Sequence, residues 1–171
     1  AKQDWTSQTK YEAGTYTVYA RNHESDTHWQ EANDNWGDAY YEGYTSVIVN
    51  AGETAKAEIS CGTAKNARLK VQFDLVSNFK EYSLKANRNL VFDSSNFETA
   101  LAYYAATEEV DYTFNYKYND DEKSINGKIT MAGAATENII SIASNDNGTI
   151  SVTVNYNDTF ETGKKKNVTI Y

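Results

Sequence analysis

Apolar and polar residues alternate strictly along residues 54–61 and again along residues 67–74. In the first segment the alternate positions are Ala, Ala, Ile and Cys, and in the second they are Ala, Leu, Val and Phe. Successive side chains of a strand point to opposite faces of a sheet, so a period of two indicates a strand with one buried face. The pattern therefore predicts two half-buried strands of the kind found in antiparallel sheets.

Shorter runs of the same kind cover most of the remaining chain. Residues 112–118 place Tyr112, Phe114 and Tyr116 on one face, which we expect to lie in a core. Asn145 to Gly148 favours a hairpin turn, because Asn-Gly tolerates the positive φ of a type I′ turn. Further strands are expected at residues 15–20, 44–50, 82–86, 90–92, 101–105, 125–131, 139–142, 150–154 and 168–170.

The spacing of these strands predicts an all-β chain of two Greek-key β-sandwich domains. We expect a small N-terminal sandwich at residues 1–65 and a fuller C-terminal sandwich at residues 66–171. Four strands scarcely close a sandwich, and an open edge leaves backbone groups that seek a partner. The missing strand is expected either from residues 1–12 or, by strand addition, from a segment before Ala1 or another subunit. The four strands recognisable in the first domain are 15–20, 45–50, 54–61 and part of 66–73.

Residues 21–43 show no strand periodicity and form a long connection rich in aromatic side chains. Loops longer than about 15 residues are usually functional or disordered, and the aromatic content argues against disorder. Two interpretations follow from this composition. The rings cover the open end of the sandwich, or they form a platform on which sugar rings stack. The candidate ligand-binding residues are Trp29, Trp36, Tyr40, Tyr41 and Tyr44.

Composition narrows the classes of partner. The formal net charge of −8 argues against a nucleic-acid partner, which requires a basic face, and against docking on an anionic lipid surface. No apolar run approaches the roughly 20 residues of a membrane-spanning helix. The single cysteine, Cys61, excludes an internal disulfide. Because Cys61 ends the apolar face of a predicted strand, we expect a buried structural thiol rather than a reactive one.

The sequence offers little catalytic chemistry. Nucleophilic catalysis needs a base beside the nucleophile, and the chain has two histidines, His23 and His28, and no G-x-S-x-G turn. Phosphate-binding and dinucleotide-binding motifs are also absent from the sequence. His23, Asp26 and His28 could together supply zinc ligands, but they lack regular ligand spacing. We expect a protein that is not an enzyme and that needs neither a metal nor a cofactor.

Several segments, taken in order, resemble a domain-of-unknown-function family of Bacteroidales surface lipoproteins, related in style to the fimbrillins. The resemblance covers most of the chain, and its motifs are structural: glycine turns, a cysteine on an apolar face and alternating strands. The segments that carry it are residues 13–20 (Ala-Gly-Thr-Tyr-Thr-Val-Tyr-Ala), 39–43, 49–53, 59–61, 67–73, 145–154 and 168–170.

The resemblance implies transthyretin-like or immunoglobulin-like sandwiches in a secreted, lipid-anchored or pilus-associated protein. The leading hypothesis is a non-enzymatic cell-surface adhesin or fimbrial scaffold component, located outside the cell on the outer membrane. The alternative is a carbohydrate-binding surface module that uses the aromatic loop 21–44. Expected partners are other surface or fimbrial subunits, or host or glycan ligands.

Two departures from the family pattern qualify what the resemblance implies. The sequence does not begin with a lipid-acceptor cysteine, so an anchor is expected only upstream of Ala1. Members of the family usually carry further β structure before the Ala-Gly-Thr-Tyr strand, and here a short polar lead precedes it. This second departure also predicts a first sandwich that is short of a strand.

Overall fold

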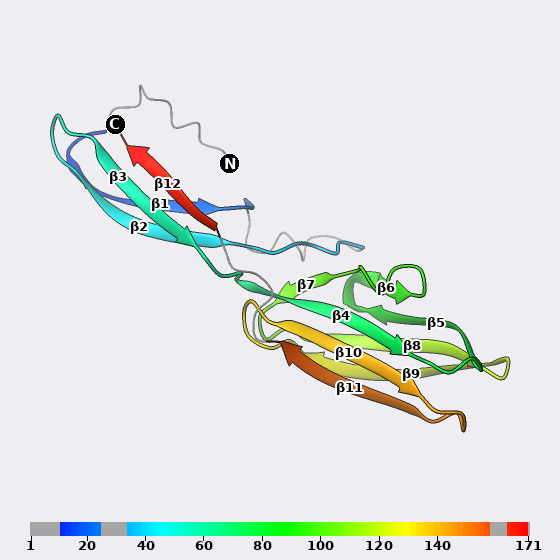
Figure 1. Ribbon diagram of the computed structural model, residues 1–171. Coiled ribbons are helices and arrows are strands. Elements are labelled where there is room, and N and C mark those ends of the chain that lie inside the picture. The colour runs from blue at the N-terminus through cyan, green and yellow to red at the C-terminus, as the bar shows by residue number, and fades with distance from the viewer. Residues whose placement is uncertain (1–10, 25–33, 158–163, 171) are drawn as a thin grey trace. The chain divides into compact units, whose positions relative to one another are not determined.

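The computed structural model describes residues 11–24, 34–157 and 164–170 (Figure 1). Their regular elements are strands and one short 3₁₀ turn, so the expected all-β sandwich class is confirmed. Among these residues no helix is long and apolar enough to cross a membrane. Contacts divide them into two compact units. Unit 1 holds the described residues of 11–24, 40–65 and 164–170, and unit 2 holds those of 34–39 and 66–157.

Unit 1 consists of two antiparallel pairs of strands. The first pair is β1 (Gly14–Arg21) with β2 (Glu42–Val49), and the second is β3 (Ala55–Cys61) with β12 (Lys164–Ile170). Alternation along β1, β2 and β3 turns one side of each of these three strands toward a shared core. That core consists of Val18, Val47 and Val49 from the first pair and Ala57 and Ile59 from β3.

The fourth strand of unit 1 is not the one predicted for the first domain. Residues 66–73 belong to β4 of unit 2, and the fourth strand of unit 1 is β12, from the end of the chain. The register sets Val168 opposite Ala57 and Ile170 opposite Ala55. Residues 34–39, which were expected in the first domain, also group with unit 2. The pattern of a strand reveals which face is apolar but not which strand lies beside it.

Unit 2 is a sandwich of two four-stranded sheets. One has the order β11-β10-β4-β7 and the other the order β6-β5-β8-β9. β4 and β10 run parallel, and every other neighbouring pair in these two sheets is antiparallel. The strands are β4 (Asn66–Asp74), β5 (Phe79–Ala86), β6 (Leu90–Asp93), β7 (Ala102–Ala105), β8 (Glu109–Tyr118), β9 (Asp121–Thr130), β10 (Glu137–Ser144) and β11 (Ile150–Asn157), with the 3₁₀ turn η2 at Asn87–Asn89.

The inner faces of these two sheets form the larger core. Tyr112, Phe114 and Tyr116 are buried in it, so the aromatic face predicted from residues 112–118 is confirmed. The Phe114 ring stacks on Tyr116 beside it and on Phe73 of the opposite sheet, with ring centres 5.0 and 5.9 Å away. Aromatic contacts of this kind connect the two layers.

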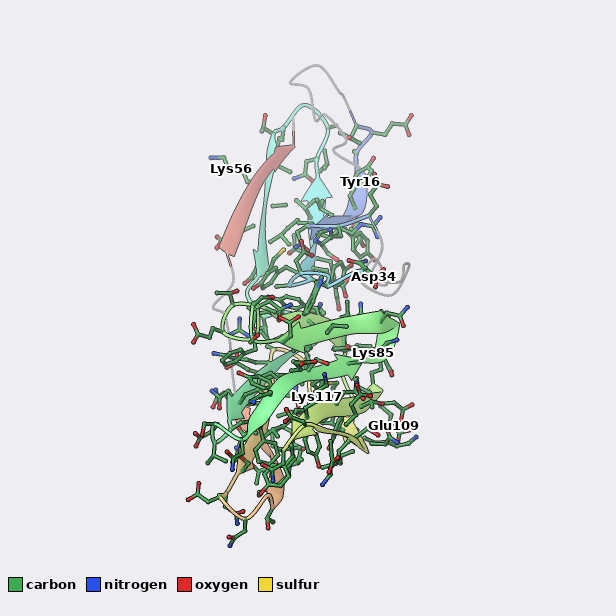
Figure 2. All side chains as sticks on the ribbon, turned by 90° about the vertical axis from the view of Figure 1, so that its right-hand side faces the viewer. Tyr16, Asp34, Lys56, Lys85, Glu109 and Lys117 are labelled. Atoms are coloured by element: carbon green, nitrogen blue, oxygen red, sulfur yellow. The ribbon has the colours of Figure 1, made fainter. Side chains whose placement is uncertain are left out.

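The outer face of the β6-β5-β8-β9 sheet is polar. Figure 2 labels Lys85, Lys117 and Glu109 on its strands. Lys128 of β9 lies 2.6 Å from Glu109 and 3.2 Å from Asp111, and these two carboxylates raise the pKa of its ammonium. Charged side chains on this face keep it in water and leave the opposite face for the core.

Candidate functional site

The outward side of the β1–β2 ladder carries the most exposed aromatic side chains among the large apolar residues that the structure describes. Tyr19 and Tyr44 are 71% and 72% exposed, and Ile48 farther along β2 is 66% exposed. The register places Tyr19 directly opposite Tyr44, with ring centres 5.8 Å apart and planes inclined by 40°. We call this outward side the tyrosine face. Its members are Thr15, Thr17, Tyr19, Arg21, Glu42, Tyr44, Ser46 and Ile48.

The cross-strand pairs determine which side chains lie next to each other along the tyrosine face. Arg21 lies opposite Glu42 at one end, and Thr15 lies opposite Ile48 near the other. Between them are the tyrosine pair and a pair of hydroxyl side chains, Thr17 and Ser46. Opposite residues on one side of an antiparallel ladder lie about 5 Å apart, so neighbouring pairs form one continuous strip. The strip combines aromatic rings, hydroxyl groups and one pair of opposite charges.

Close packing behind the tyrosine face fixes its position. Next to Tyr44, a Cβ atom added at Gly43 would lie 2.3 Å from the backbone oxygen of Ser60 in β3. Only glycine allows β2 to approach β3 so closely. Val18 and Val47, which point away from the tyrosine face, are buried in the core of unit 1. The two strands therefore hold the tyrosine face on a packed support.

Tyr40 lies just before β2 and is 1% exposed. Its hydroxyl donates a hydrogen bond of 2.9 Å to Oε2 of Glu42. Burial, and then the negative charge of Glu42, raise the pKa of Tyr40, while Arg21 acts in the opposite direction. The phenol therefore remains protonated at neutral pH, and its hydrogen bond holds the charged end of the tyrosine face.

The aromatic residues that the sequence offered as candidates do not all lie in the same unit. Trp36 belongs to unit 2, where its ring packs edge-on against Phe92 at 4.9 Å. Tyr40 is buried, and Tyr41 is half-buried with its backbone N–H bonded to Oδ1 of Asn22. Tyr44 is exposed, and Trp29 lies outside the described residues.

Of these candidates, Tyr40, Tyr41 and Tyr44 belong to unit 1, whereas Trp36 belongs to unit 2. Sequence reasoning missed Tyr19, the partner of Tyr44 on the tyrosine face. Alternation with the buried Val18 already turns Tyr19 outward, so one signal was present in the sequence. The pairing with Tyr44 depends on the register of the two strands, which periodicity does not provide.

Cys61 and His23 are the other candidate reactive residues in the described part of the chain. Cys61 was expected to be buried but is half-buried, because it ends β3 at the margin of the core of unit 1, with Sγ 3.6 Å from the carbonyl oxygen of Ala20. Within the described ranges, no three His, Cys, Asp or Glu side chains form a group that could hold a metal ion. His23 lies near Tyr40, with ring centres 6.5 Å apart. His28 and Asp26 lie outside the described residues.

A shallow hollow lies on the outer face of unit 2, where β5 carries a bulge between Lys80 and Ser83. Glu81 in this bulge has a φ of 47° and lies 2.6 Å from Nζ of Lys117. The hydrogen bond that the Lys117 ammonium donates to Glu81 raises the pKa of Lys117. The ammonium is thus held in its charged, ion-paired form, which suits a surface ion pair rather than proton transfer. The hollow is lined by Glu81, Asn115, Tyr116, Lys117, Glu122, Lys123 and Ser124.

Comparison with protein families gives a match that extends over residues 1–171. The matching family is described as a domain of unknown function (DUF4493). Comparison with curated proteins and with solved structures gives no match. The expected membership of a domain-of-unknown-function family is therefore confirmed at that level. Since the family model covers the whole sequence, this chain belongs to the DUF4493 family of domains of unknown function.

Proposed function

We propose that the protein is a non-enzymatic cell-surface adhesin or fimbrial scaffold component that contacts its partner through the tyrosine face. The observation that carries the proposal is the exposed pair of Tyr19 and Tyr44, each more than two-thirds accessible to water. Contiguous exposed apolar side chains mark interaction surfaces, and tyrosine is enriched among the residues that dominate binding energy. Ile48 extends the same strip along β2.

The support beneath the strip favours a binding role. β1 and β2 pair without a shift of register over the eight residues of each strand. The buried valines and the close approach at Gly43 limit movement of this ladder. Binding to a preorganised surface costs less conformational entropy than binding to a loop that must first become ordered. The tyrosines therefore present a ready-made contact area.

The proposal includes a fimbrillin-like relationship, a Bacteroidales surface lipoprotein as the parent molecule and a location on the outside of the outer membrane. These parts are supported by the sequence motifs at residues 13–20 and 67–73, which resemble those proteins. Other surface or fimbrial subunits are the proposed partners. The two-unit, all-β organisation is compatible with a scaffolding role.

A second candidate function is carbohydrate binding on the same tyrosine face. Three hydroxyl side chains, Thr15, Thr17 and Ser46, flank the aromatic pair. Sugar rings present an apolar C–H surface and a rim of hydroxyl groups. Aromatic rings beside hydrogen-bonding side chains can contact both. Among the candidate aromatic residues that the structure describes, Tyr44 is the one whose exposure favours this alternative.

The experiment compares the full chain with the double variant Tyr19→Ser/Tyr44→Ser. Both are applied to an array of immobilised glycans and to a surface-protein extract of the producing cells. Tyr156→Ser is the matched control, because Tyr156 is also exposed, at 55%, but lies on β11 of unit 2. We expect the double variant to lose binding and the control to retain it.

The two probes separate the two candidate functions. Capture of a defined surface subunit supports the adhesin or scaffold function, whereas selective binding to one glycan class supports the alternative. Circular dichroism of the double variant checks that its fold is unchanged. Binding that is identical in all three proteins would contradict both functions of the tyrosine face.

A further inference from the structure

Strand β11 forms one edge of the β11-β10-β4-β7 sheet of unit 2. It pairs with β10 on one side, and in the described part of the chain no strand pairs with its other side (Figure 1). Its sequence, ISVTVNYN, contains no charged residue, no proline and no glycine. Such a strand presents a row of backbone N–H and C=O groups that can pair with another chain.

The other edge strands of unit 2 carry features that discourage pairing. β6 and β7 are four residues long, which leaves little backbone to extend. β9 is ten residues long but carries Asp121, Glu122, Lys123 and Lys128. Short strands and charged side chains are the usual protection of sheet edges. β11 has neither: it is eight residues long and keeps an uninterrupted register with β10.

The side chains of β11 are arranged for a partner of the same kind. Ile150, Val152 and Val154 are half-buried against the core of unit 2, and Tyr156 continues this side with 55% exposure. The opposite side consists of hydroxyl and amide side chains that are exposed, namely Ser151, Thr153 and Asn155. A matching neighbour needs apolar residues on the first side and uncharged polar residues on the second. β11 itself has this pattern.

We propose that two copies of the protein associate through antiparallel pairing of β11 with β11, about a two-fold axis at Thr153. In this register Ile150 lies opposite the partner's Tyr156, and Val152 lies opposite the partner's Val154. Apolar residues then meet apolar residues along residues 150–156, and Thr153 meets its own copy. If the two-fold axis passed through Val152 instead, Tyr156 would lie opposite Gly148. If one strand were shifted by a single residue, Val152 would lie opposite a polar side chain.

The resulting interface is isologous, because the same strand contributes on both sides. It extends the sheet across two molecules and covers the exposed ring of Tyr156. The chain carries a formal net charge of −8, whereas β11 carries none, so repulsion between copies is long-range and screened by salt. The dimer is therefore expected to strengthen as salt is raised. This inference goes beyond the proposed function, because it involves no residue of the tyrosine face.

The first test is site-specific cross-linking of the full chain with Cys61 replaced by Ser. In that background, Thr153→Cys should form a disulfide-linked dimer under mild oxidation. Opposite Cα atoms in an antiparallel pair lie about 4.5–5.5 Å apart, within the range of a disulfide. Ser151→Cys is the matched control, because the two copies of residue 151 would be offset by four residues, or about 14 Å. Equal cross-linking at the two positions, or none at position 153, would overturn the proposal.

The second test measures oligomeric state by sedimentation velocity. Thr153→Lys places two ammonium groups at the two-fold axis and should abolish the dimer, while leaving the fold intact because Thr153 is exposed. Thr130→Lys makes the same substitution at an exposed position of β9 and should remain dimeric. A monomeric wild-type protein at high concentration and high salt would overturn the proposal, and so would a Thr153→Lys protein that still dimerises. Ligand binding by the tyrosine face should be unchanged in Thr153→Lys, which separates this test from that of the proposed function.

Discussion

Replacement of Phe114 by alanine tests the core of unit 2 most severely. Phe114 lies in the middle of β8, is fully buried and contacts aromatic rings from both sheets. A buried phenylalanine removes about 150–250 Å² from water, which at about 25 cal/mol per Å² is worth roughly 4–6 kcal/mol. Alanine keeps a small part of that area, and the cavity left behind adds a cost. We expect Phe114→Ala to lower the free energy of unfolding by about 3–5 kcal/mol.

The assay is urea denaturation followed by circular dichroism, with amide hydrogen exchange to locate the loss. Exchange should accelerate in β5 and β8, whose residues Leu84 and Phe114 lie opposite each other. Val91→Ala is the control, because Val91 is 37% exposed on β6, and its loss should stay below about 1 kcal/mol. A loss below about 1 kcal/mol for Phe114→Ala would refute the assignment of this aromatic face to the core.

Three further predictions concern backbone packing, pH and a half-buried ion pair. Gly43→Ala should destabilise unit 1 by about 1–3 kcal/mol in thermal unfolding, because the new Cβ would lie 2.3 Å from a backbone oxygen of β3. Burial raises the pKa of Tyr104 from 10.0 to about 12, so its contribution to stability is complete below pH 10 and is lost as pH rises through about 12. Across a series of alkaline pH values, the free energy of unfolding should fall by about 3 kcal/mol more in the wild-type protein than in Tyr104→Phe. Arg68 and Glu137 join β4 to β10 with a contact of 2.6 Å and side chains only 18% and 12% exposed. Arg68→Ala should therefore lower the free energy of unfolding by about 3 kcal/mol in a denaturation experiment. A loss near zero would show that water solvates the remaining Glu137 carboxylate as well as Arg68 does.

The sequence predicted the strands well, because alternation directly reports a half-buried strand. The predicted segments 15–20, 54–61 and 67–74 form β1, β3 and β4, with ends that differ by one residue. Ends of strands are set by hydrogen bonding to neighbours, so periodicity places them less well. The same limit explains β12, which runs from Lys164 although the alternation of apolar residues begins only at Val168.

The neighbours of each strand could not be predicted from its pattern. β3 and β4 follow each other in the chain, yet β3 pairs with β12 and β4 lies between β10 and β7. The parallel pairing of β4 with β10 needs a connection through the second sheet, which no local signal announces. The tyrosine face could not be predicted from the sequence for the same reason. Tyr44 was a candidate from composition, but Tyr19 joins it only through the register of β1 and β2.

The tyrosine face is the proposed contact surface for a partner, and its affinity can be measured directly. The decisive measurement is the dissociation constant of the full chain for the glycan or surface protein that it captures. We expect Tyr19→Ser/Tyr44→Ser to weaken this binding at least tenfold, a change of about 1.4 kcal/mol, and Tyr156→Ser to leave it within about twofold. Equal dissociation constants for the wild-type protein and the double variant would contradict a binding role for the tyrosine face.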